Sequence, residues 1–162
     1  MTHADGAERL DYTGAVYGSL LAASVVVGAG ALGDFPRIEL ALLLLCTGVV
    51  FWAAHVLTRL LGERIMYVPL DRREVRRVCM AEWPIVKAAV PPAAAVAATP
   101  LLGLGPEGAA WLGLGVALVG QIGWASVAAL RAGATALVVV TAGAANLVLG
   151  SAIVLFKVAL TH

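Results

Sequence analysis

The sequence predicts an all-α integral membrane protein, a bundle of about five transmembrane helices with one short basic amphipathic helix at the membrane interface. Of its 162 residues, 61% are hydrophobic and only 13% are charged. Soluble domains carry about a quarter charged residues, and a soluble chain of this length has too little interior to bury so much apolar material. We therefore treat residues 1–162 as a single transmembrane domain.

Five apolar stretches each approach the length of about 20 residues that a helix needs to cross the hydrocarbon core. They cover residues 14–33, 38–61, 85–104, 110–130 and 133–160. The last two are split at residues 131–133, because a single helix of about 50 residues is far longer than one crossing. The acidic segment ahead of the first stretch is not typical of a secretory signal peptide, so we expect the first span to be retained.

The distribution of arginines predicts the orientation of the chain. The loop after the second span and the turn after the fourth carry most of them, namely Arg64, Arg72, Arg73, Arg76, Arg77 and Arg131. The loop between the third and fourth spans carries only Glu107. Because lysine and arginine are retained in cytoplasmic loops, we expect a multi-pass protein of the cell's inner (plasma) membrane, with its N-terminus cytoplasmic and its C-terminus outside.

The charged segment 69–83 has the pattern of a short amphipathic helix. Asp71 and Glu74 have the spacing of a capping box, and apolar residues then recur at helical spacing, ending at Trp83. The remaining positions include Arg72, Arg73, Arg76 and Arg77. Such a helix is expected to lie on the cytoplasmic leaflet and to bind anionic lipid headgroups. It is either a topology anchor alone or a docking site for lipid or a partner.

The stretch VFWAAHVLTRLL places Trp52, His55 and Arg59 on one face of the second span. Arg59 lies near the inner end, where its side chain can extend to the headgroups. His55 is one turn deeper and is expected to face the bundle or a wet cavity. Histidine titrates nearest neutrality, so His55 is a candidate proton relay or gate. The alternative is a neutral packing residue that donates one hydrogen bond to a neighbouring helix.

The third span contains Lys87 together with several prolines. Pro91 and Pro92 each remove a backbone donor and free the carbonyls near residues 87 and 88, which predicts a kink close to Lys87. Glu82, just before this span, is a possible ion-pair partner for Arg59 or Lys87.

Polar and small residues mark the inner faces of the other spans. Gln121 and Asn146 lie in the middle of the fourth and fifth spans, and no carboxylate lies at that depth. Small residues at helical spacing predict close helix contacts through Gly14 and Gly18, through Gly113, Ala117 and Gly120, and through Gly143 and Gly150.

These residues suggest two functions. The first is a small channel-like or transport protein that works as a homo-oligomer and handles protons or anions, with pore or relay candidates His55, Trp52, Arg59, Lys87, Gln121 and Asn146. The second is a non-transporting accessory or scaffold protein whose basic cytoplasmic helix binds lipid or a partner. No catalytic set, metal-ligand spacing or phosphate loop is present, so we expect no enzymatic activity, no metal and no cofactor. The net charge of +1 gives no attraction to nucleic acid.

Overall fold

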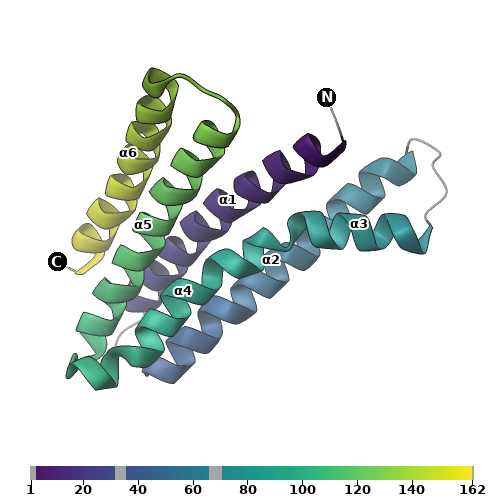
Figure 1. The fold of residues 1–162 in the computed structure, drawn as a ribbon. Coiled ribbons are helices and arrows are strands. Elements are labelled where there is room, and N and C mark those ends of the chain that lie inside the picture. Colours follow the sequence, from purple (N-terminus) through teal and green to yellow (C-terminus); the bar gives the residue numbers. More distant parts are fainter. Residues whose placement is uncertain (1–2, 32–35, 66–70, 162) are drawn as a thin grey trace.

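The computed structural model describes residues 3–31, 36–65 and 71–161, and all regular secondary structure among them is helical (Figure 1). The elements are α1 (His3–Ala31), α2 (Arg37–Ile65), α3 (Arg72–Glu82), α4 (Pro84–Ala98), the 3-10 helix η1 (Thr99–Leu102), α5 (Pro106–Arg131) and α6 (Ala136–Thr161). Pro69 and the expected end of the first span at residue 33 lie outside the described residues. The prediction that the chain is all-α is confirmed for these residues.

Four helical segments are long and apolar enough to cross a membrane. They are Arg37–Gly62, Arg72–Leu102, Pro106–Arg131 and Ala136–Ala159. The second of these runs through α3, α4 and η1, whereas the sequence predicted a separate basic helix followed by a span. In α1 the described apolar segment is Gly14–Gly30, which is shorter than the other four.

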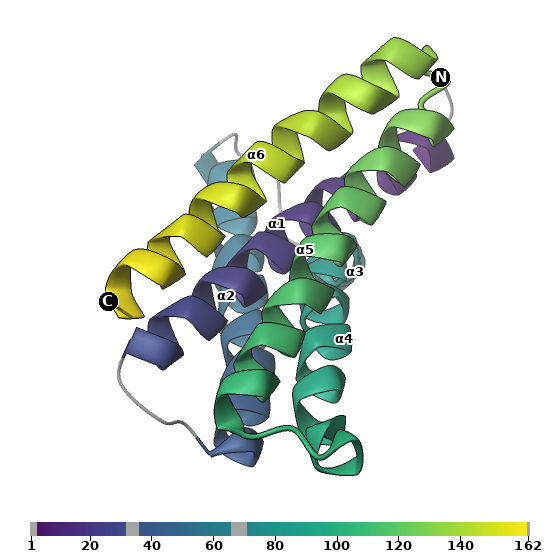
Figure 2. The same cartoon turned by 90° about the vertical axis from the view of Figure 1, so that its left-hand side faces the viewer.

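The central helix α1 packs against α2, α4, α5 and α6. Helix α2 lies beside α4 on one side of the bundle, and α6 lies beside α5 on the other (Figures 1 and 2). The start of α1, the start of α3 and the α5–α6 turn lie away from the α4–α5 turn, toward one end of the bundle that we call the basic end (Figure 1). The α4–α5 turn and the end of α6 lie at the opposite end (Figure 2).

Glycines let the helices approach closely, as the small-residue pattern predicted. A Cβ atom on Gly18 of α1 would lie 2.6 Å from the carbonyl oxygen of Ile85 in α4. On Gly113 of α5 it would lie 2.6 Å from a methyl group of Val96, and on Gly150 of α6 it would lie 2.8 Å from Leu118. At Gly18 the obstacle is backbone, whereas at Gly113 and Gly150 it is a side chain that would have to shift, and all three glycines mark close contact faces.

The chain bends one turn before Lys87 and not at the paired prolines that led us to expect a kink there. Helix α4 runs unbroken through Pro91 and Pro92, and the chain changes direction at Trp83, where α3 meets α4 (Figure 1). Pro84 occupies the first turn of α4, where its missing N–H removes no helical bond. In a continuing helix, however, residue 84 would donate to the Met80 carbonyl, and Pro84 has no N–H to do so. The Trp83 N–H bonds that carbonyl instead, at 3.4 Å, and α3 ends there.

The start of α3 agrees in part with the predicted capping box. Asp71 is the N-cap, and its carboxylate accepts the backbone N–H of Arg72 at 2.6 Å. The side chain of Glu74 instead accepts a hydrogen bond from Arg77, 3.0 Å away. The cap therefore comes from Asp71 alone.

Candidate functional site

Two side chains of α2 hold α3 in place. Arg59 forms an ion pair with Glu82 at 2.7 Å, and the carboxylate side chain is only 12% exposed. The indole N–H of Trp52 donates to the carbonyl of Cys79 at 2.9 Å, and its ring meets Trp83 edge to face at 5.5 Å. Of the two partners considered for Glu82, the structure selects Arg59. The face of α2 that carries Trp52 and Arg59 is thus the surface against which α3 packs.

The His55 side chain points toward α1 and not toward α3. Its Nδ1 lies 2.9 Å from the carbonyl oxygen of Phe51, one turn earlier in the same helix. A carbonyl only accepts, so Nδ1 carries the hydrogen. The ring centre lies 5.1 Å from that of Tyr17 in α1. The alternative interpretation expected His55 to donate to a neighbouring helix. That expectation is wrong, because the acceptor is the Phe51 carbonyl of its own helix.

Gln121 and Asn146 meet between α5 and α6. The Gln121 amide nitrogen donates to the Asn146 side-chain oxygen at 3.0 Å, and the Asn146 amide nitrogen donates to the Ala142 carbonyl at 2.9 Å. Gln121 is 1% exposed. Its side-chain oxygen is buried and has no hydrogen-bond partner within the part of the chain that the structure describes. This pair therefore leaves one buried acceptor unfilled at mid-span.

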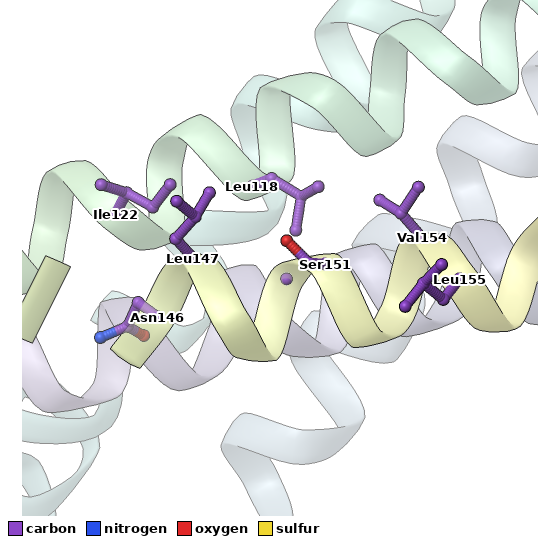
Figure 3. A pocket seen from close by; sticks show the side chains of 8 residues that line it. Leu118, Ile122, Asn146, Leu147, Ser151, Val154 and Leu155 are labelled. Atoms are coloured by element: carbon purple, nitrogen blue, oxygen red, sulfur yellow. The ribbon is translucent and has the colours of Figure 1, made fainter. Parts of the chain in front are cut away.

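An open groove of about 280 Å³ runs beside this pair along α5 and α6 (Figure 3). Its walls are apolar except for Asn146 and the exposed Ser151. Its lining consists of Leu118, Ile122, Asn146, Leu147, Gly150, Ser151, Val154 and Leu155. The groove thus exposes an apolar surface at the middle of two spans.

Lys87 faces outward from the bundle. It is exposed on α4, whereas its neighbours Val86, Ala88 and Ala89 are buried. Among the pore and relay candidates, the structure therefore brings together Gln121 with Asn146, and separately aligns Trp52 with Arg59. His55 lies between Trp52 and Arg59 along α2 but contacts Phe51 and Tyr17 instead of α3, and Lys87 faces outward.

The exposed face of α3 is strongly basic. Arg72, Arg73, Arg76 and Arg77 are all exposed, while Val78 and Glu82 on the other side are buried. The nearby carboxylates are already engaged, because Asp71 caps the helix, Glu74 pairs with Arg77 and Glu82 pairs with Arg59. Among the described residues, Arg72, Arg73 and Arg76 have no carboxylate partner. This face therefore has unbalanced positive charge.

Sequence reasoning missed two polar contacts at the opposite end. Lys157 of α6 is 5% exposed, and its ammonium lies 4.4 Å from the ring centre of Trp111 in α5. Glu107, one turn before Trp111, lies close enough to act on this lysine electrostatically. A guanidinium nitrogen of Arg37 donates to the carbonyl of Leu104, which ties the start of α2 to the α4–α5 turn. The available signal was the isolated Lys157 in an apolar span.

Within the described residues, no three His, Cys, Asp or Glu side chains gather closely enough to hold a metal ion. The chain matches no protein-family model, no curated protein and no solved structure. Its function is therefore argued from its own residues.

Proposed function

We propose that this chain is a non-transporting accessory or scaffold protein that presents α3 as a docking helix for anionic lipid headgroups at the cytoplasmic face of the plasma membrane. One observation carries the proposal. Arg72, Arg73 and Arg76 are exposed and have no carboxylate partner among the described residues, while the other side of α3 is fixed to α2 through Glu82 and Cys79. A fixed cationic surface suits the recognition of an external anion, because its orientation is set before binding.

The proposed placement has five spans, namely α1, α2, α4 with η1, α5 and α6. Helix α3 then lies in the headgroup layer, because it bends away from α4 at Trp83 and carries its arginines on the exposed side. The basic end, which also carries the exposed Arg131, is the cytoplasmic one by the positive-inside rule. The N-terminus is then cytoplasmic and the C-terminus outside.

The proposal is tested by replacing Arg72, Arg73 and Arg76 together with glutamine. The protein is reconstituted in phosphatidylcholine vesicles that contain phosphatidylglycerol, and electron paramagnetic resonance of spin-labelled lipids compares how strongly the protein retains each lipid. Each arginine contributes about 1 kcal/mol near an anionic surface, so the native preference for phosphatidylglycerol is lost in the triple variant.

The matched control is Arg77→Gln, which removes one charge that Glu74 already balances. This variant keeps most of the native preference for phosphatidylglycerol. An unchanged preference in the triple variant shows that α3 does not dock anionic lipid.

A second function, proton or anion transport by a homo-oligomer, is favoured by the buried Gln121 oxygen beside Asn146, which has no hydrogen-bond partner among the described residues. An unfilled acceptor at mid-span suits a bound water or a passing proton carrier. The test is proton and anion flux into liposomes across about pH 5.5 to 8, the range in which histidine titrates. Transport predicts flux that Gln121→Leu removes and whose pH dependence changes in His55→Ala. No flux from native protein rejects this function.

A further inference from the structure

Lys87 shares one side of α4 with Trp83. The backbone N–H of Lys87 donates to the Trp83 carbonyl at 3.2 Å, so the two residues are one helical turn apart, and Arg76 and Met80 are exposed on α3 ahead of the bend. Met80 is 61% exposed and Trp83 is 37% exposed. Beyond Lys87 the same side continues with the exposed residues Pro91, Ala94 and Ala98, whose small side chains form an apolar surface.

The depth of Lys87 is set relative to Trp83. Tryptophan prefers the boundary between headgroups and hydrocarbon. Lys87 lies four residues further along, or about 6 Å at the rise of an α-helix. A lysine side chain spans this distance, so its ammonium can reach back to the level of the Trp83 indole. Both groups therefore meet near the phosphates of one leaflet.

Neither donor has an acceptor from the described part of the chain. The nearest carboxylate along the chain, Glu82, is buried and already pairs with Arg59. No described residue accepts a hydrogen bond from the exposed Trp83 indole or from the Lys87 ammonium. An unpaired ammonium in hydrocarbon is costly, which favours its position at the headgroup level, where an anion from outside the chain can reach it.

We propose that Lys87 and Trp83 form a discrete binding site for the phosphate of one anionic glycerophospholipid. The Lys87 ammonium and the Trp83 indole N–H donate to the phosphate oxygens, and the acyl chains lie along Pro91, Ala94 and Ala98. The positive charge of Lys87 favours a headgroup of net negative charge over a zwitterionic one. The site rests on the proposed placement of α3 in the headgroup layer. A lipid fits better than a protein carboxylate because apolar surface adjoins the donors on the membrane side.

The test is native mass spectrometry of purified protein with an equimolar mixture of phosphatidylglycerol and phosphatidylcholine. Native protein retains phosphatidylglycerol selectively, and Lys87→Gln weakens its tightest binding about fivefold, as expected for one interfacial charge. Lys87→Arg restores it. Arg131→Gln, which removes an exposed charge from the same end of the bundle, leaves that tightest binding unchanged.

A second measurement needs no change at Lys87. Phosphatidylglycerol brominated on its acyl chains quenches tryptophan fluorescence more than brominated phosphatidylcholine, and this difference disappears in Trp83→Phe. Equal quenching by the two lipids in native protein overturns the proposal. Unchanged phosphatidylglycerol binding by Lys87→Gln also overturns it and leaves a carboxylate of another membrane protein as the partner.

The two lipid proposals fail separately. If the triple arginine variant loses its preference while Lys87→Gln binds like native protein, the discrete site is overturned and the docking surface stands. If Lys87→Gln loses its lipid while the triple variant keeps the native preference, the docking surface is overturned and the discrete site is supported.

Discussion

The indole N–H of Trp52 lies 2.9 Å from the carbonyl oxygen of Cys79 and replaces a hydrogen bond that α3 lacks at its end. In a continuing helix, Cys79 would receive the N–H of Trp83. That N–H bonds Met80 instead, because Pro84 has none to give. A side chain from α2 thus completes the backbone pairing of α3 and fixes where the chain bends.

We predict that Trp52→Phe lowers the free energy of unfolding by about 1–2 kcal/mol. The ring remains, but the Cys79 carbonyl loses its donor in a partly buried place. The change is measured by titrating purified protein from mild detergent into sodium dodecyl sulfate and following its helical signal. Leu57→Ala is the control, because Leu57 is exposed on the same helix and its truncation leaves no cavity. Equal effects of the two changes would show that the Trp52 hydrogen bond does not stabilise the fold.

The Arg59–Glu82 pair is expected to respond asymmetrically. Arg59→Gln leaves a buried carboxylate without its cation and costs about 2 kcal/mol, a value below that of a fully buried pair because the arginine is partly exposed. Glu82→Gln costs less, because the arginine can turn to water and the new amide still accepts a hydrogen bond. The same unfolding titration measures both. A larger loss for Glu82→Gln contradicts this account.

Gly18→Ala is predicted to push α1 away from α4. Its Cβ would lie 2.6 Å from a backbone oxygen of Ile85, which cannot rotate aside. Overpacking of this kind costs about 1–3 kcal/mol. Gly28→Ala on the same helix is the matched control, since nothing lies within 4 Å of its added Cβ, and it is neutral or slightly stabilising. If both variants have the same free energy of unfolding, α1 and α4 do not approach each other as closely as described.

Local patterns determined the helices and their charged end, and so these were predictable. Apolar length marked the long helices, and Asp71 marked the start of α3. The bend was misplaced because paired prolines suggested Pro91, whereas the helix passes through them and breaks ahead of Pro84.

Contacts between helices were harder to predict from the sequence, because they depend on how each helix is rotated within the bundle. Arg59 and Glu82 are 23 residues apart in the chain, and Gln121 and Asn146 are 25 apart. Their residue types and shared depth suggested candidates without fixing the partners. The outward direction of Lys87 likewise follows from the burial of its neighbours on α4 and not from any motif.

The Gln121–Asn146 pair yields the last prediction, which separates packing from function. Asn146→Leu leaves the Gln121 amide nitrogen without its side-chain acceptor in a buried place, beside an oxygen that already lacks a donor. We expect it to cost about 1–3 kcal/mol. Gln121→Leu removes both buried amide atoms and is neutral or stabilising, because Asn146 keeps its bond to the Ala142 carbonyl.

The double variant Gln121→Leu with Asn146→Leu is therefore more stable than Asn146→Leu alone, as measured by thermal unfolding in detergent. Residues in contact give such non-additive effects. A Gln121→Leu protein that is clearly less stable than native protein would mean that the buried oxygen has a bound partner, such as an ordered water, whose loss the leucine cannot replace. That result would favour the transport function, because it places a polar species in the middle of the spans.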